Sequence, residues 1–505
     1  MLPPLTGRRA LTAVGAALGL LAHPAIAGAA TTSDAIAGSL SPGAAVDTFF
    51  VIFAAVLVLL MQPGFLLLEV GFSRGKNSGT VVAKILINFS VAVLAFWAVG
   101  FAFAFGPDAG GLIGNHGFFL ADTGPVAAAA AENSFPVLAV SQATIEAKFL
   151  FQFAFAAVAL AIVWGPTLER IKFGVYVAFG IVFASVIYPI AAHWIFGGGF
   201  LQVGDWLGTG IVGMQDFAGS AVVGVVPAIA GLAAILVLGP RAGKYAPDGS
   251  PRAIPGHNMP LFGLGVTLLM IGWVGFNGGT ALGAGDGRAG QIIVITLISG
   301  GAGTIAAVLV AHWKTHTIDI GMAGNGMIAG LVAITAPAGY IHTWPAPIIG
   351  AVAGAIVPLA VYAIDRHIDD PVGALSAHGI CGIWGTISCG IFSAPVFAQY
   401  NKIGDPGGGL WYDPSGSQLI AQVAGLIVLS TFVFVASYAT FRLIHAVYGV
   451  RVSYDHEVAG LDISEHGMYG YPEQFIPEAE LAPWGLSPSP MRHASAESTP
   501  QESQS

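Results

Sequence analysis

Charged residues are scarce in this sequence. Asp, Glu, Lys and Arg make up 9% of its 505 residues, whereas hydrophobic residues make up 55%. An ordinary soluble domain carries about 25% charged residues, so the composition excludes that class and indicates a protein that crosses a membrane several times. The net charge of −9 comes largely from loops and from the acidic tail after Val452, and no basic stripe indicates nucleic-acid binding.

Cysteine is almost absent as well. The two present, Cys381 and Cys389, are separated by about 12 Å if they share one helix, which is too far for a disulfide. Two thiols with the neighbouring His378 make a poor zinc site, so we interpret both as small buried hydrophobes. The sequence also lacks a phosphate-binding loop, a Ser/His/Asp constellation and paired catalytic carboxylates, and it predicts no enzyme, no cofactor and no metal.

The N-terminal region has the pattern of a secretory signal peptide. Arg8-Arg9 precedes an apolar run over residues 10–22, and Ala25-Ile26-Ala27 follows. We expect a signal peptide over residues 1–27 and a short periplasmic segment over residues 28–46. An uncleaved first helix is the alternative, although the apolar run is short for a membrane span.

The rest of the chain is dominated by apolar runs long enough to cross a bilayer. They lie near residues 47–72, 79–105, 146–165, 173–196, 217–239, 259–282, 291–313, 318–336, 346–364, 372–394 and 418–447. The sequence therefore predicts an all-α membrane protein with eleven transmembrane helices, in one membrane domain over residues 47–447. A tail over residues 448–505 follows and is expected to be disordered from about residue 487.

Lysine and arginine gather in alternate gaps between these runs. Arg74, Arg170 and Arg241 each stand in such a gap with further basic residues, whereas Arg288 and Lys402 are exceptions in the other gaps. Cytoplasmic loops of membrane proteins carry an excess of lysine and arginine, so we assign the gaps with Arg74, Arg170 and Arg241 to the cytoplasm. We therefore expect the mature N-terminus outside and the C-terminus in the cytoplasm.

Two of the runs begin with an acidic residue and reach the middle of the membrane eight residues later. Asp216 lies at the expected outer face and Gly224 follows it near the midplane. Asp370 lies at the expected inner face and His378 follows it near the midplane. Carboxylates are costly in hydrocarbon, so both should face a cavity or another helix. The opposite directions predict an inverted five-helix repeat, in which spans 1–5 and 6–10 are related by an axis in the membrane plane and form a site at their interface.

Aromatic side chains mark a candidate path. Phe151 and Phe155 are four residues apart and share a helical face, although packing is an alternative role for both. Trp273 and Phe276 stand among glycines that let other backbones approach the rings. A ring beside a cation replaces part of its water through cation–π attraction of about 0.5–2 kcal/mol.

Few polar groups lie within the apolar runs. Thr280 offers a hydroxyl acceptor near the outer end, and His378 stands among small residues near the midplane, where either a structural or a functional role is open. We interpret His193 as structural. Glu69 and Lys84 are expected to pair across helices, and an architectural role outweighs a proton relay for them.

At this point an ordered series of motifs resembles the Amt/Rh ammonium transporter family, and its Amt branch specifically. The resemblance runs from roughly Asp47 to Tyr471, nearly the whole mature chain. The motifs that carry it are Arg74-Gly-Lys-Asn, Phe151-Gln-Phe-Ala-Phe, Glu169-Arg-Ile-Lys-Phe, Asp216-Phe-Ala-Gly, His257-Asn-Met-Pro, Gly272-Trp-Val-Gly-Phe-Asn, Asn325-Gly-Met-Ile-Ala-Gly-Leu-Val, Asp369-Asp-Pro and His378-Gly-Ile-Cys-Gly-Ile. Chance does not produce this series.

The resemblance implies the ammonium transporter fold and a homotrimer with a separate pore in each subunit. Ammonium would be recruited at an outer vestibule, pass a gate of stacked rings, lose its proton and cross an apolar pore lined by histidine. The residues implied for recruitment are Phe151, Phe196, Thr280 and Asp216, the last organising the site rather than binding directly. Those implied for the gate and the pore lining are Phe155, Trp273, Phe276, Gly224 and His378.

Two positions depart from the family pattern. Phe196 stands where a tryptophan is usual, and Gly224 stands where the family has a first pore histidine that pairs with the position of His378. We expect the pore to be wider beside His378, with room for one or more waters and weaker discrimination against potassium, unless Val223 or Ile383 fills the space.

We therefore predict an ammonium transporter in the inner (plasma) membrane of a bacterium, with ammonium or methylammonium as substrate. A transport-impaired ammonium sensor is the alternative that Gly224 suggests. A small-solute channel of the aquaporin kind is disfavoured because paired Asn-Pro-Ala elements are absent. The tail motifs Gly460-Leu-Asp and Glu465-His-Gly predict that the tail packs across neighbouring subunits and that a PII-type signal protein plugs the inner pore mouths.

Overall fold

The computed structural model describes residues 40–121, 135–398, 400 and 407–475. The expected signal peptide and the tail from residue 487 lie outside these ranges. Within them the chain is helical and forms no strand beyond isolated bridges. Ten continuous helical segments of the described chain are long and apolar enough to cross a membrane: Pro42–Phe72, Gly75–Phe105, Ile145–Thr167, Phe173–Val203, Ser220–Leu238, Met259–Gly279, Arg288–Thr315, Ala346–Ile364, Leu375–Phe392 and Ser417–Val447.

The remaining run of the eleven predicted from the sequence forms a shorter apolar helix. This helix, α14 (Ile320–Thr335), has 16 residues and spans about 24 Å, less than the hydrocarbon core of about 30 Å. It packs against α12 (Met259–Gly279), α13 (Arg288–Thr315), α15 (Ala346–Ile364) and α16 (Cys381–Phe392). Neighbouring helices rather than lipid therefore cover most of its surface.

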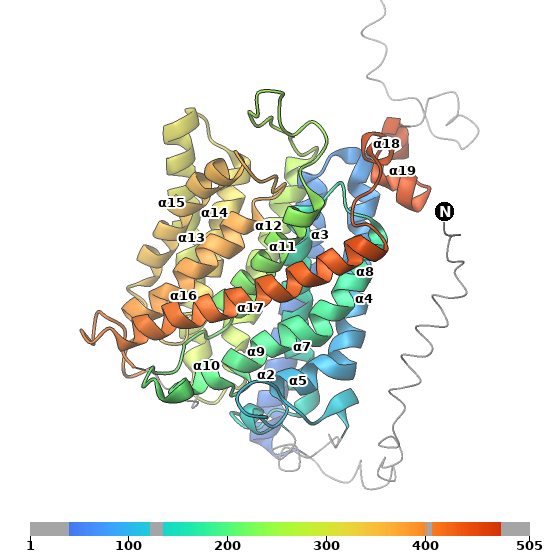
Figure 1. The fold of residues 1–505 in the computed structure, drawn as a ribbon. Helices are drawn as coiled ribbons and strands as arrows, with labels where there is room; N and C mark the ends of the chain where they lie inside the picture. The colour runs from blue at the N-terminus through green and yellow to red at the C-terminus, as the bar shows by residue number, and fades with distance from the viewer. Residues whose placement is uncertain (1–39, 122–134, 399, 401–406, 476–505) are drawn as a thin grey trace, which may run out of the picture.

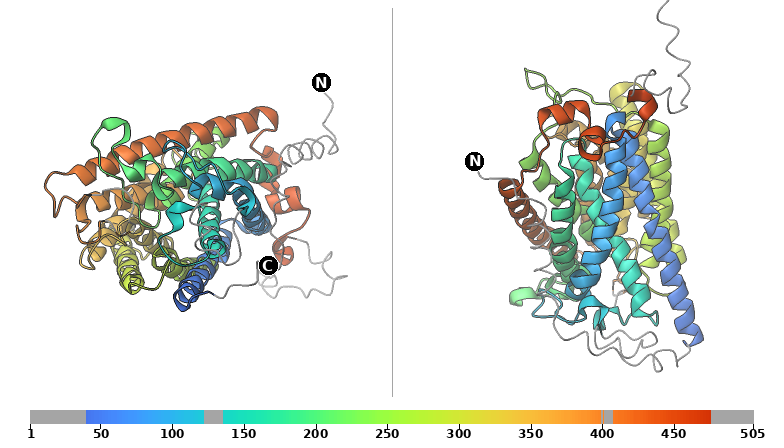
Figure 2. Two further views of the ribbon diagram at one scale, coloured as in Figure 1. Left: turned by 90° about the horizontal axis from the view of Figure 1, so that it is seen from below. Right: turned by 90° about the vertical axis from the view of Figure 1, so that its right-hand side faces the viewer.

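The long helix α17 (Ser417–Val447) lies outside the upright bundle and crosses it obliquely (Figure 1). It contacts α8 (Phe173–Val182), α11 (Val226–Leu238) and α16, and the view from below places it along one side (Figure 2). The eleventh span therefore lies against one side of the bundle, in contact with helices of both halves of the chain. The short helices α18 (Tyr454–Ala459) and α19 (Leu461–His466) mark one end of the bundle, which we call the inner end.

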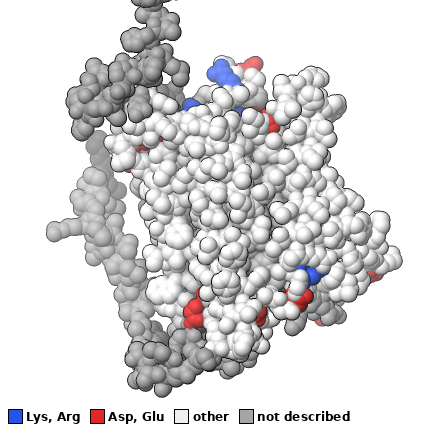
Figure 3. Space-filling view, turned by 180° about the vertical axis from the view of Figure 1, so that it is seen from behind, with Lys and Arg blue, Asp and Glu red and all other residues white. Residues whose placement is uncertain are grey.

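Helix α7 (Ile145–Trp164) occupies the centre of the bundle, and nearly all of its side chains are buried. The helices around it supply a largely uncharged outer surface, and Figure 3 shows charged side chains on one face gathered toward its two ends. The remaining helices are α2 (Pro42–Leu59), α3 (Met61–Phe72), α4 (Ser78–Ala95), α5 (Phe101–Phe105), α9 (Tyr188–Phe196), α10 (Phe200–Val203) and α20 (Pro472–Phe475).

The first helix begins earlier than the apolar run that predicted it. Ser41 accepts a hydrogen bond from the Ala44 backbone at 3.1 Å, and Pro42 takes the first helical position. A capping serine followed by proline is a strong helix start. Helix α2 therefore extends into the segment that the sequence assigned to residues 28–46.

Asp216 caps a span rather than lying inside it. Its carboxylate accepts backbone hydrogen bonds from Gly219 at 3.0 Å, Ala221 at 3.0 Å and Val222 at 2.9 Å. Gly219 has φ +111°, a conformation that favours glycine, and the helical backbone starts at Ser220 as a π-helical turn. The expected start at residue 217 is therefore three residues early.

Asp370 begins its span in a similar way at the opposite end of the molecule. Its carboxylate accepts a hydrogen bond from Leu375 N at 2.7 Å, and the span again starts with a π-helical segment, Leu375–Ile380. This segment contacts the π-helical segment Ser220–Val225 near the middle of the bundle. Two spans that start alike from opposite ends agree with the inverted repeat predicted from the sequence.

Glycine lets α13, α14 and α15 pack at backbone distance. A Cβ on Gly350 would lie 2.1 Å from Ser299 O, and one on Gly354 would lie 2.1 Å from Gly303 O. Any side chain at these positions would separate the helices. Small residues take this role in membrane bundles because close packing, rather than a hydrophobic force, drives helices together in lipid.

Candidate functional site

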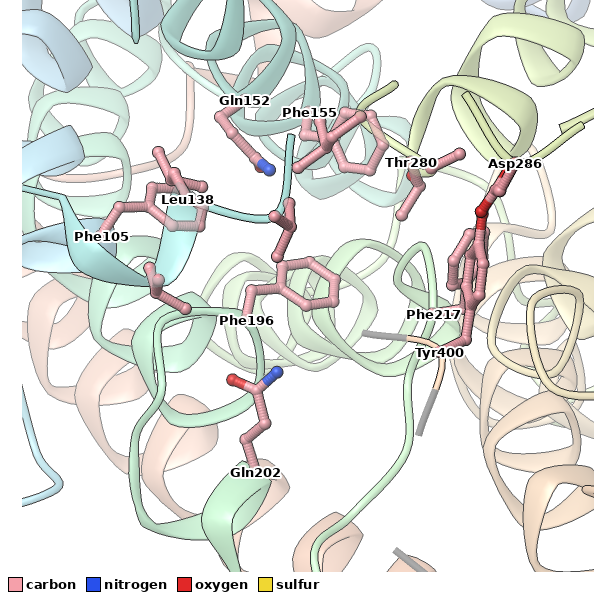
Figure 4. Close-up of a pocket in the computed structure, with 14 residues that line it drawn as sticks. Phe105, Leu138, Gln152, Phe155, Phe196, Gln202, Phe217, Thr280, Asp286 and Tyr400 are labelled. Atoms are coloured by element: carbon pink, nitrogen blue, oxygen red, sulfur yellow. The ribbon is translucent and has the colours of Figure 1, made fainter. Parts of the chain in front are cut away.

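A cavity of about 400 Å³ opens at the outer end of the bundle. Aromatic and aliphatic side chains make up most of its wall, with Gln152, Gln202, Thr280 and Asp286 as polar members (Figure 4). The remaining lining residues are Phe105, Val137, Leu138, Val140, Phe155, Phe196, Phe217, Ala281, Leu282 and Tyr400. Such a mixture suits a small cation that exchanges part of its water for aromatic faces and oxygen acceptors.

Phe196 and Thr280, two of the residues predicted for recruitment, line this cavity. The Thr280 hydroxyl donates to Phe276 O at 2.8 Å, which leaves its oxygen lone pairs for a donor in the cavity. The exposed Asp286 adds a carboxylate, and its Oδ1 accepts from Arg288 N at 2.9 Å. Sequence reasoning missed Asp286 and Gln202, because a residue within Gly285-Asp286-Gly287 reads only as a turn.

Phe151 does not line the cavity and is fully buried. Its ring packs behind Phe155 with 4.7 Å between centroids, in a space opened by Gly279, whose Cβ would lie 2.6 Å from Cε2 of Phe151. Gln152 and Phe155 occupy the cavity wall on this helix, and the contact of Phe151 with ammonium stays a prediction. Helical spacing identified a shared face but not the depth of each ring along it.

Phe155 and Phe276 form the closed end of the cavity. Their rings stack with 3.9 Å between centroids and 9° between planes. Trp273 lies 6.0 Å from Phe276 and donates its indole hydrogen to Thr335 Oγ1 at 3.0 Å. Phe155 lines the outer cavity, and Phe276 lines the next one, so the stacked pair separates the two spaces.

Asp216 does not contact Trp273 directly but is linked to it through hydrogen bonds of the segment that it caps and through Thr335. It caps the segment whose Ala218 N donates to Thr335 O at 3.1 Å, and Thr335 in turn holds Trp273. In the same segment, Ser220 donates to Val332 O at 2.6 Å and accepts from Ala336 N at 2.6 Å. The buried carboxylate therefore fixes the segment that holds the end of α14 and, through Thr335, Trp273. The role of Asp216 as a residue that organises recruitment stays a prediction.

Beyond the stacked rings the path narrows to two small cavities. The middle cavity has about 10 Å³ and is lined by Trp273, Phe276, Thr335, Gly224, His378 and apolar side chains. The inner cavity has about 20 Å³ and is lined by His378, Glu69, Asn325 and further apolar side chains. His378 lines both, and its buried Nδ1 has no hydrogen-bond partner in the described chain. A ring nitrogen without a partner in an apolar constriction keeps its capacity for a hydrogen bond.

Gly224 does not open the space expected from the missing histidine. A Cβ at this position would lie 3.3 Å from His378 O and 3.3 Å from Val332 Cγ1. Val332 and Val223 line the middle cavity, whose volume of about 10 Å³ is at the lower limit for one water. The predicted room for one or more waters is thus limited to one at most in the middle cavity, because the neighbouring valines Val223 and Val332 line that space.

An ion network buried at the inner end was not assigned a role from the sequence. Asp369 accepts hydrogen bonds from Arg241 N at 2.7 Å and Nη2 at 2.9 Å, and Arg170 Nη1 lies 3.9 Å away. Burial raises the pKa of Asp369, but the hydrogen bonds from Arg241 and the charge of Arg170 outweigh burial and lower it to about 2. Arg74 and Arg241 likewise hold the pKa of buried Glu169 below its usual value, against the opposing effect of burial.

The comparisons with known proteins agree with this arrangement. The model of the Ammonium Transporter Family matches residues 48–471. Ammonium transporter Amt2 of Archaeoglobus fulgidus is 41% identical over 87% of this chain and 91% of its own length, and ammonium transporter Amt1 of Haloferax mediterranei is 36% identical over 86% and 80%.

Two solved structures share the fold. One, of a sensor Amt protein, has a TM-score of 0.74 and 32% identity over 84% of this chain and 99% of its own. The other, of Candida albicans Mep2, has a TM-score of 0.73 and 27% identity over 86% and 92%. On the family match along most of its length, this chain belongs to the ammonium transporter family.

Proposed function

We propose that this protein conducts ammonium across a membrane, recruiting the cation in the outer cavity and passing it as ammonia through the constriction beside His378. One observation carries the proposal: a wide cavity with oxygen acceptors and aromatic faces leads to the stacked pair Phe155 and Phe276, and then to two spaces of about 10 and 20 Å³ lined by one histidine. The lining of these three spaces by Phe155, Phe196, Thr280, Trp273, Phe276, Gly224 and His378 supports the proposal.

The dimensions favour a substrate that gives up a proton. Each inner space accommodates at most one small molecule and offers few polar atoms, so a potassium ion would lose nearly all its water without replacement. Ammonium has an alternative, because transfer of one proton to an acceptor leaves neutral ammonia. Selection then rests on the ability to shed a proton rather than on ionic radius.

Proteoliposomes test the proposal. Purified protein exposed to an ammonium gradient should give transport-dependent changes in current or internal pH that an equal potassium gradient does not give. Liposomes without protein provide the baseline, and radiolabelled methylammonium provides an independent uptake assay. Responses indistinguishable from protein-free liposomes in both assays would contradict the transport proposal.

A second candidate function is ammonium sensing with impaired conduction. Gly224 replaces the expected first pore histidine, the constriction beside it is narrow, and one of the similar solved structures is of a sensor Amt protein. Calorimetry separates the two: a sensor binds ammonium in the outer cavity without methylammonium uptake, whereas a transporter shows both.

For the assembly, we infer three copies in the inner membrane of a bacterium, each with its own pore, and the tail on the cytoplasmic side. The basic residues Arg74, Arg170 and Arg241 cluster at the end that carries α18 and α19, which supports this orientation. A PII-type signal protein at that end remains the proposed partner. Mass determination in detergent and pull-down with a PII protein test the two statements separately.

A further inference from the structure

Two buried titratable side chains lie in the inner half of the bundle, and one of them, Glu69, also lines the inner cavity. Glu69 on α3 and Lys84 on α4 form an ion pair, with side-chain exposures of 2% and 0%. Charged side chains at such depth are costly, and those that persist in membrane proteins commonly mark routes for ions or protons. The pair therefore calls for a role beyond joining two helices.

The pair belongs to a polar seam between α3, α4 and α7. One turn from Lys84, Asn88 accepts from Trp164 Nε1 at 3.0 Å and donates to Ala157 O at 3.1 Å. Gln62, two turns before Glu69, lies within 3.5 Å of the Asn88 amide. These neutral groups already join the three helices, so the added charges of Glu69 and Lys84 are not required for that purpose.

Glu69 reaches the conduction path, which a purely architectural pair need not do. The nitrogen of Lys84 binds Oε2 of Glu69. Oε1 lies on the side of Gly165, whose Cβ would be 3.8 Å from it, and both Glu69 and Gly165 line the inner cavity together with His378. The cavity, lined by both the histidine and the carboxylate, has about 20 Å³, which is room for one water.

On this geometry, and resting on the proposed transport function, we propose that Glu69 is the inner proton-exchange site of the pore, with Lys84 as the residue that holds its carboxylate ionised between turnovers. Ammonium in the middle cavity loses a proton to His378: one N–H bond of ammonium breaks and an N–H bond forms on the ring. The ring passes this proton through the water of the inner cavity to Oε1 of Glu69. Ammonia that has moved past His378 then takes the proton from the carboxyl group, which restores ammonium, the neutral ring and the carboxylate.

This sequence consumes no further reactant, and each cycle moves one ammonium with its single positive charge. A carboxylic acid suits the final step because ammonia is far the stronger base, so proton transfer to ammonia is downhill. Lys84 opposes the build-up of protonated Glu69 after transfer, because its positive charge stabilises the carboxylate. In this chain Glu69 supplies a second proton acceptor on the inner side of His378. Gly224, on the outer side, supplies none.

The wild-type protein gives the first test, with methylammonium uptake and ammonium-evoked current measured on the same proteoliposomes. Uptake accompanied by current, slowed in heavy water, is expected. Uptake without current would overturn the proton-exchange proposal and leave the transport function standing. Neither uptake nor current would instead contradict the transport function itself.

The second test removes the acceptor without leaving a lone buried charge. In the double variant Glu69→Gln/Lys84→Met, current is expected to fall roughly tenfold or more, in the range typical of a lost proton-transfer group. Uptake should fall less, so the ratio of current to uptake drops. Asp108→Asn is the matched control: it removes a carboxylate paired with buried His193 at the outer end, 2.9 Å from its ring, and should leave the ratio unchanged. A wild-type ratio in the double variant would overturn the assignment.

Discussion

At the residue scale, the position of a side chain along the path matters more than its membership of a shared face. The family resemblance implies Phe155, Phe276, Trp273 and His378 as gate or pore residues, and each of them lines the outer or the middle cavity. Phe151 lies one turn from Phe155 and yet packs behind it. The difference arises because Gly279 on a neighbouring helix leaves a slot for the ring, a tertiary feature that no spacing within one helix reveals.

Replacement of Asp216 by alanine is expected to abolish methylammonium uptake. The variant leaves three buried backbone N–H groups without their acceptor, at about 1–3 kcal/mol for each unsatisfied group, and frees the segment that holds Thr335 and Trp273. Asp216→Asn, which keeps one acceptor oxygen, should retain part of the activity. Uptake and thermal unfolding of the purified variants check both statements. Near-normal uptake by the alanine variant would remove Asp216 from the site.

At Gly224, the expected effect of a histidine is sharper selectivity with lower ammonium current. A Cβ already meets His378 O and Val332 at 3.3 Å, so the larger side chain must displace neighbours by a few tenths of an ångström and narrow the middle cavity. Gly224→Ala controls for added bulk without a ring nitrogen. Potassium and ammonium currents through the three proteins measure the effect. Equal ratios of ammonium to potassium current in all three proteins would contradict the idea that this position sets discrimination between the two ions. Ammonium current in the histidine variant alone would favour the sensor function.

At the scale of the element, the limits of the apolar runs predicted where helices lie better than how they start. Ser41 and Pro42 carry a recognisable start signal, yet it precedes the run that was used to place the first span. The two π-helical starts after Asp216 and Asp370 follow from hydrogen bonds to carboxylates and from contact between the two segments. The hydrogen bonds are local, but the contact between Ser220–Val225 and Leu375–Ile380 joins distant parts of the chain, so composition and periodicity carry no trace of it.

The ion network at the inner end predicts a specific dependence on pH. Asp369 has a pKa of about 2 against a usual 3.8, so its bonds to Arg241 stabilise the fold above pH 4 and are lost as pH falls toward 2. The shift corresponds to about 2 kcal/mol. Asp369→Asn should lower the unfolding temperature at neutral pH and flatten its decline between pH 4 and 2. Asp248→Asn, in an exposed loop, is the control. Parallel pH profiles for wild type and Asp369→Asn would contradict the assigned role.

At the scale of the whole molecule, the tail closes the chain onto its own inner face. Asp462 on α19 accepts from Gly79 N at 2.9 Å and Thr80 N at 2.8 Å, at the start of α4, and Glu465 accepts from Phe173 N at 3.1 Å, at the start of α8. A carboxylate at a helix N-terminus is favourable because it pairs with free N–H groups and the helix dipole. Packing of the tail across neighbouring subunits, predicted from the same motifs, stays a prediction.

This connection predicts that the tail influences conduction from a distance. Thr80, which Asp462 caps, precedes Lys84 by one turn of α4, and Lys84 binds Glu69 at the inner cavity. Asp462→Ala should release the tail, which limited proteolysis detects as faster cleavage after residue 460. It should reduce the ammonium current more than it reduces the binding of ammonium in the outer cavity. Asp455→Ala on exposed α18 is the control.

Truncation before Val452 should reduce the ammonium current more strongly than Asp462→Ala does, and it should abolish PII association. A truncated protein with unchanged current and unchanged PII association would show that the tail is an inert extension.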